Sequence, residues 1–116
     1  MGQYLKIRKN GNPLYNKVRH AKSFTERAFG LMFKESMEDM DALLIEPCRS
    51  IHTFFMKFDI DVVFLNRKNE VVKIIRNFRP WRATPIYFKS NKVLEFLGGT
   101  LNSEIEIGDE LEIIYV

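Results

Sequence analysis

The stretch Cys48-Arg-Ser-Ile-His-Thr-Phe-Phe-Met-Lys-Phe-Asp-Ile-Asp-Val-Val-Phe-Leu65 decides how the rest of this chain is organised. Its first half holds side chains that can do chemistry. Its second half, residues 60–65, is a β-branched and aromatic run of the kind that forms a strand buried on both faces. Alternate residues of an extended chain point to one side of a sheet, so Cys48, His52 and Met56 would share a face. The stretch therefore predicts a site, or an internal polar brace, beside a core strand.

Strand patterns and turn residues surround this stretch. Residues 70–76 follow a turn at 67–69 and predict an antiparallel hairpin with 60–66. The motif Asn10-Gly-Asn-Pro13 lies between two alternating runs and predicts a second hairpin. The strands expected elsewhere are residues 4–8, 14–19, 42–45, 92–97 and 111–116.

One helix is expected. Ser23-Phe-Thr-Glu26 has the spacing of a capping box, and apolar residues at helical spacing follow it. These signals predict a short helix near residues 24–33, weakened at Gly30. The fold class is therefore α+β and mainly β, with a curled antiparallel or mixed sheet or a partial barrel. We expect residues 1–116 to form a single domain.

Composition places the chain among ordinary globular proteins. Of its 116 residues, 46% are hydrophobic and 28% charged, and no run approaches the ~18 apolar residues of a membrane span. The single cysteine excludes an internal disulfide and agrees with a reducing compartment. We therefore expect a cytoplasmic protein without a membrane span.

The formal net charge of +3 is unevenly distributed. Residues 1–25 and 71–94 contain no acid, whereas residues 104–112 are rich in acids. The basic segments could pair with the acidic terminal strand across the sheet, which is the simpler interpretation, or converge into a surface that attracts anions.

Several short motifs, kept in one order, resemble those of a known family. They are Ser23-Phe-Thr-Glu-Arg-Ala-Phe-Gly-Leu-Met-Phe33, residues 48–64, Pro80-Trp-Arg82, Val93-Leu-Glu95 with Gly98-Gly-Thr100, and Ile107-Gly-Asp109. From about Ala21 onward the chain is similar to the domain-of-unknown-function 192 family of small prokaryotic proteins. The resemblance implies a compact β-rich domain and no particular activity. The chain departs from the family pattern at Ala42, Phe55, Asp59 and Asn66, and it shows no amino-terminal export signal of the kind many relatives carry.

Cys48, His52 and Met56 are soft ligands of the kind that suits copper(I). On a strand, however, residues four apart are separated by about 13 Å and cannot share an ion. The same separation disfavours His52 as a base for a Cys48 nucleophile. We therefore expect no metal and no cofactor, with Cys48 acting as a small hydrophobe and Met56 as core.

Asp61 is the most informative position, because its apolar neighbours predict a buried carboxylate that needs a partner. The candidate cations are Arg27, Arg49, His52 and Arg82. One interpretation is an internal ion pair that pins the loop at residues 80–82. The other is a polar pocket with Asp61 as its floor, His52 as its wall, and Trp81 and Arg82 as its lid. Glu95 could add a second carboxylate, or be a strand-edge acid paired with a lysine.

These residues lead to three hypotheses about function. The first is a binding or accessory module for a small polar or anionic ligand, bound by Arg49, His52, Asp61, Trp81 and Arg82. The second is nucleic-acid binding, with bases stacked on Trp81, Tyr87 or Phe88. The third is a hydrolase-like enzyme that uses His52 and Asp61. We favour the binding module over an enzyme, because no electrophilic helper accompanies His52.

Overall fold

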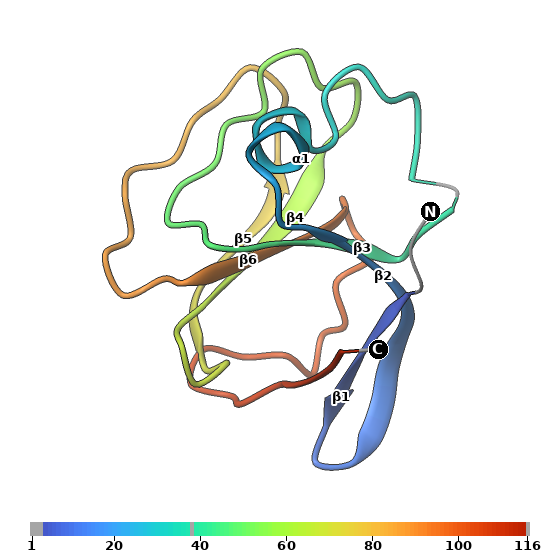
Figure 1. Cartoon of the computed structure of the whole chain (residues 1–116), viewed down its shortest axis with the longest axis vertical. Coiled ribbons are helices and arrows are strands. Elements are labelled where there is room, and N and C mark those ends of the chain that lie inside the picture. Colours follow the sequence, from blue (N-terminus) through green and yellow to red (C-terminus); the bar gives the residue numbers. More distant parts are fainter. Residues whose placement is uncertain (1–3, 38, 116) are drawn as a thin grey trace.

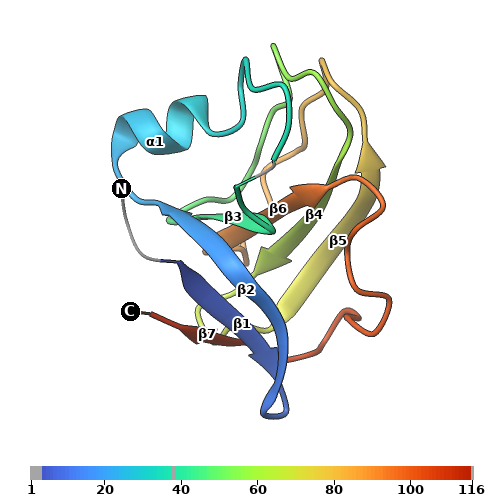
Figure 2. The same ribbon diagram turned by 90° about the vertical axis from the view of Figure 1, so that its right-hand side faces the viewer.

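The computed structural model describes residues 4–37 and 39–115. These residues form one short helix and a seven-stranded sheet with the order β5-β4-β6-β3-β2-β1-β7 (Figure 1). The sheet curls into a half-barrel (Figure 2), which confirms the mainly β fold predicted from the sequence. The elements are β1 (Leu5–Lys9), β2 (Asn12–Ala21), α1 (Phe24–Phe29), β3 (Ala42–Ile45), β4 (Ile60–Leu65), β5 (Val71–Phe78), β6 (Lys92–Leu97) and β7 (Glu112–Ile114).

Both predicted hairpins are present. β1 pairs with β2 antiparallel, and the turn residues Asn10 and Gly11 have φ of 52° and 79°, the left-handed values that such a turn requires. β4 pairs with β5 antiparallel across the predicted turn. The sheet is mixed because β2 and β3 run parallel.

The register of β4 against β6 determines which polar side chains can meet. Asp61 is opposite Phe96, and Val62 is opposite Glu95. Since neighbouring residues of a strand face opposite sides, Asp61 and Glu95 point to different faces of the sheet. Asp61 shares its face with the apolar cluster around Phe96 and Leu101, and Glu95 shares its face with the cluster around Val62 and Met56.

α1 is shorter than the helix predicted at residues 24–33. Its start is as expected, since the Ser23 side chain accepts from the Glu26 amide and the Glu26 side chain accepts from the Ser23 amide. The helix ends at Gly30, whose φ of 43° breaks the helical hydrogen bonding. None of the residues of α1 is buried. It therefore lies on the surface at one end of the sheet (Figure 2), and Leu31 just beyond it is buried in the core.

Candidate functional site

Asp61 is buried, as the sequence predicts, but its partners are not cations. Its side chain is 1% exposed, and its carboxylate accepts hydrogen bonds from the backbone amides of Asn77 (2.8 Å), Gly99 (2.9 Å) and Leu101 (3.0 Å). The prediction that a cationic side chain neutralises Asp61 is therefore wrong. Three amides at the ends of β5 and β6 satisfy the charge instead, and they make Asp61 a brace for two loops.

The four candidate cations make hydrogen bonds elsewhere. Arg49 donates from Nε to the Ser90 carbonyl at 3.2 Å, and Arg27 donates to the Pro47 carbonyl at 3.4 Å. Arg82 donates to the carbonyl of its neighbour Trp81, and His52 Nδ1 accepts from the Phe54 amide at 3.2 Å. The pocket expected around Asp61 is thus not assembled from these residues, because Asp61 faces the other side of the sheet from the face on which Arg49 and His52 lie.

The loop containing Trp81 and Arg82 is held by a residue that the sequence analysis did not single out. Thr53 is buried, and its hydroxyl donates to the Arg79 carbonyl (2.6 Å) and accepts from the Arg82 amide (2.9 Å). The Thr53 carbonyl also accepts from the Trp81 amide at 2.9 Å. The loop is therefore fastened to residues 52–55 rather than laid over Asp61. The sequence signal that could have indicated this role of Thr53 is its position directly before the apolar residues 54–56.

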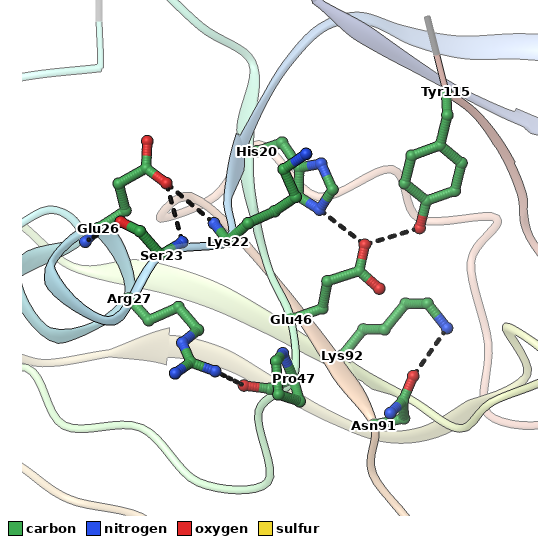
Figure 3. Close-up of polar contacts among 10 residues, drawn as sticks. All are labelled: His20, Lys22, Ser23, Glu26, Arg27, Glu46, Pro47, Asn91, Lys92 and Tyr115. Carbon is green, nitrogen blue, oxygen red and sulfur yellow. Dashed lines mark hydrogen bonds and ion pairs between the residues drawn. The ribbon is translucent and has the colours of Figure 1, made fainter.

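A pocket of about 300 Å³ lies on the Glu95 face, between α1, residues 47–52 and the sheet. Arg27 joins the two sides of its rim through its hydrogen bond to Pro47 (Figure 3). Arg49 and His52, two of the five predicted site residues, line this pocket. Its wall is mainly apolar and includes Phe24, Phe29, Leu31, Ile45, Ile51 and Met56, with Cys48 and Glu95 as further lining residues.

Glu95 is the exceptional member of this wall. Its side chain is 4% exposed on β6, which lies inside the sheet between β3 and β4, with Leu43 and Val62 beside it. Among the described residues, its carboxyl group has no hydrogen-bond or ion-pair partner. Burial raises the pKa of Glu95 from 4.5 to about 8. The interpretation of Glu95 as a strand-edge acid paired with lysine is therefore wrong.

Cys48 lies beside Glu95 in the pocket wall. Burial, with the Glu95 charge as a smaller cause, raises the pKa of the Cys48 thiol to about 11, and the thiol donates to the Ser50 carbonyl at 3.1 Å. Cys48 is thus a protonated thiol rather than a ready nucleophile. Met56 is buried in the core, as expected. Across residues 4–37 and 39–115, no three His, Cys, Asp or Glu side chains gather closely enough to hold a metal ion.

Charged side chains outside the pocket pair across the sheet. Lys9 contacts Asp109 at 2.8 Å, and Arg8 contacts Glu112 at 3.6 Å, so the basic amino-terminal segment does pair with the acidic terminal segment. A second polar cluster joins β2 to the ends of β3 and β7. One Glu46 oxygen lies 2.6 Å from His20 Nε2 and 2.8 Å from the Tyr115 hydroxyl (Figure 3). Burial and the Glu46 charge raise the pKa of Tyr115. These contacts fasten the chain end to the sheet.

The structure also locates the other candidate residues. Tyr87 packs against Phe64 with 4.7 Å between ring centroids, which leaves less of its ring for stacking on a base, whereas Phe88 and Trp81 are exposed. The hydrolase hypothesis needs His52 and Asp61 together, and the sheet separates them. In the part of the chain that is described, no helix has the length and apolar character needed to cross a membrane.

Fold and site together define a small β-rich domain whose curled sheet carries an apolar pocket with one buried, unpartnered acid. Residues 5–113 match the model of the domain-of-unknown-function 192 family, which is described as "Uncharacterized ACR". The chain therefore belongs to this family, as its motifs predicted.

Relatives in archaea are similar over most of their length. A UPF0127 protein of Pyrococcus furiosus is 33% identical, with 88% of this chain and 90% of that protein covered. A UPF0127 protein of Pyrococcus horikoshii is 36% identical, with 82% and 85% covered.

Two crystal structures share the fold. A protein of unknown function from Novosphingobium aromaticivorans has a TM-score of 0.78 at 22% identity, covering 93% of this chain and 82% of that one. A protein from Sinorhizobium meliloti, described as a candidate transcription regulator, has a TM-score of 0.75 at 19% identity and covers 97% of both chains.

Proposed function

We propose that this protein is a binding module whose ligand enters the pocket beneath α1 and donates a hydrogen bond to Glu95. One observation carries the proposal. The Glu95 side chain is only 4% exposed, it lines the pocket, and no described residue supplies a partner for its carboxyl group. Buried polar groups in native proteins are almost always hydrogen-bonded, and each exception needs an explanation such as a bound water, an ion or a functional role.

An unpartnered acid at this position costs stability. Leu43 and Val62 beside it are apolar, so a leucine in place of Glu95 would extend the apolar cluster of this face. Burying a carboxyl group without a hydrogen bond costs on the order of a few kcal/mol. Asp61, by comparison, is buried but receives three hydrogen bonds. Asp61 thus supports the fold, whereas Glu95 gives the fold no comparable support and is available to a ligand.

The pocket wall indicates the chemistry of the ligand. Aromatic and aliphatic side chains dominate it, so the body of the ligand is apolar. Below pH 8 the carboxyl group of Glu95 is mainly protonated and can donate or accept, and above it the carboxylate attracts a cation. The sequence predicted a small polar or anionic ligand. The position of Glu95 favours a small amphiphile that places an amine, or another hydrogen-bond donor, against the acid.

Matched probes test this proposal. Benzylamine, benzyl alcohol and benzoate share one ring and differ in the group offered to Glu95. Titrations followed by protein NMR just above pH 8 should give saturable shifts at pocket amides such as Leu31 and Met56. The affinity should decrease from benzylamine to benzyl alcohol to benzoate.

Two variants provide the controls. Glu95→Leu should abolish the preference for the amine, whereas Glu110→Leu, at an exposed acid, should leave it unchanged. The proposal fails if none of the three probes perturbs the pocket amides, or if Glu95→Leu keeps the same order of affinities.

A further inference from the structure

Exposed aromatic side chains gather at the end of the molecule that carries the pocket. Phe33, Phe54, Phe55 and Trp81, here called the aromatic patch, are all exposed. Trp81 lies with its ring centroid 4.7 Å from that of Phe55 and 6.1 Å from that of Phe54, and Phe55 lies 5.2 Å from Phe33. The segments that carry these residues lie together at the upper end of the molecule in Figure 2. The patch is therefore one continuous surface.

The patch continues to the pocket. The His52 ring stacks on Phe54 with 5.0 Å between centroids, and His52 lines the pocket. On the other side of the pocket, Phe24 and Phe29 of α1 are also exposed. Scattered single apolar residues are normal on a protein surface, but a contiguous group of this kind marks an interaction site.

The backbone holds the patch in a strained conformation. Phe33, Phe55 and Trp81 have φ of 66°, 65° and 64°, in the left-handed region that bulky residues rarely adopt. Each such residue costs on the order of 1–3 kcal/mol and persists only where the surroundings impose it. Hydrogen bonds supply that constraint: the Phe33 amide donates to the Phe55 carbonyl at 3.0 Å, and the Trp81 amide donates to the Thr53 carbonyl at 2.9 Å. Backbone strain of this kind clusters at functional sites, which supports a binding role for the patch.

Cations flank the rings. Arg79 and Arg82, on either side of Trp81, are exposed, and neither forms an ion pair among the described residues. The whole segment 71–94 that contains them has no acid. Lys57, nearby in sequence to the patch, is paired with Glu35 and so adds no free charge. The patch thus combines exposed aromatic rings with a net positive charge.

We propose that the aromatic patch docks on the surface of an anionic phospholipid membrane. Aromatic rings sit well at the boundary between headgroups and acyl chains, and arginines beside them attract anionic headgroups. A second copy of this chain fits less well, because a symmetric contact would bring Arg79 and Arg82 of both copies together. A single-stranded nucleic acid also fits less well, since stacking needs open ring faces and the rings of Phe55 and Trp81 are turned towards each other at 60°.

Vesicles containing phosphatidylglycerol and phosphatidylcholine test the proposal, with phosphatidylcholine vesicles as the comparison. Trp81 is the only tryptophan of the chain, so its fluorescence reports on the patch directly. We expect co-sedimentation with the anionic vesicles and a blue shift of the Trp81 emission. Arg79→Ala/Arg82→Ala should weaken binding about twenty-five-fold, at about a fivefold loss per cation. Phe54→Ser/Phe55→Asn should weaken it on the order of tenfold per ring, and asparagine tolerates the φ of Phe55.

Matched variants at the other end of β5 serve as controls. Trp81 follows the end of this strand, whereas Arg67, Lys68 and Ile107 lie near its start, about 25 Å away for eight extended residues. Arg67→Ala/Lys68→Ala and Phe88→Ser/Ile107→Ser remove comparable charge and apolar surface there, and should leave binding unchanged.

Four results would overturn the proposal. They are no binding to anionic vesicles, equal losses from the patch and control variants, a lipid-independent dimer broken by Phe54→Ser/Phe55→Asn, and tighter binding of oligo(dT) than of vesicles.

Discussion

Replacing Glu95 with glutamine should change how the stability of this protein depends on pH. Burial raises the pKa of Glu95 from 4.5 to about 8, so the native protein keeps a proton that the unfolded chain releases between these two pH values. Stability must then fall as pH rises through this window and level off above pH 8, because the native state binds more protons there than the unfolded state. At 1.36 kcal/mol for each unit of pKa, the fall attributable to Glu95 is about 5 kcal/mol.

Urea unfolding followed by circular dichroism, at intervals from about pH 5 to about pH 9, measures this effect. Every other titratable group is common to both proteins, so the difference between wild type and Glu95→Gln isolates the one acid. Cys48 titrates above the window, since its pKa is about 11. We expect the variant to gain several kcal/mol on wild type as pH rises from 5 to 8. Glu110→Gln, at an exposed acid, should stay parallel to wild type.

A flat difference between wild type and Glu95→Gln across the window would refute this reasoning. It would mean that the acid stays ionised in the folded chain, with a partner that satisfies it. The Glu95 carboxylate would then stabilise the fold through its own partner, as the Asp61 carboxylate does. The pocket would no longer contain an unpartnered acid, which is the feature that supports its role as a binding site.

Three further predictions concern the residues around the site. Cys48 should react slowly with iodoacetamide at pH 7 and about tenfold faster per pH unit up to its pKa of about 11, so rapid labelling at neutral pH would contradict its burial. Asp61→Asn should lower the free energy of unfolding in urea by about 3 kcal/mol, because an amide group cannot accept all three backbone N–H donors; an unchanged midpoint would exclude its bracing role. Gly98→Ala should lower the melting temperature, since a Cβ there would meet Asp59 Cβ at 2.9 Å and its carbonyl oxygen at 3.0 Å; a variant as stable as wild type would show that this contact relaxes without cost.

Most of the fold was readable from short-range patterns. The Asn10-Gly11 turn, the turn at 67–69 and the capping box at Ser23 act within a few residues, and all three are present as predicted. The helix at 24–33 was predicted too long, because Gly30 adopts a positive φ of 43° and ends the helix rather than merely weakening it.

The candidate site was only partly readable. Arg49 and His52 do line a pocket, and both acids in apolar strands are buried. The sequence pattern predicted Asp61 as the acid that needs a functional partner, yet backbone amides satisfy Asp61, and Glu95 is the acid left without a partner. Backbone amides belong to every residue except proline, so nothing in the sequence marks which of them will converge on a carboxylate.

The amino-acid sequence alone determined the strands, the turns, the start of the helix and the family, because each depends on residues that are neighbours along the chain. Tertiary structure decided that Asp61 and Glu95 face opposite sides of the sheet, through the register of β4 against β6. It also decided that α1 covers the Glu95 side and that Thr53 directs Trp81 outward. These are relations between segments far apart in sequence, and a shift of one residue in strand pairing would have exchanged the two faces.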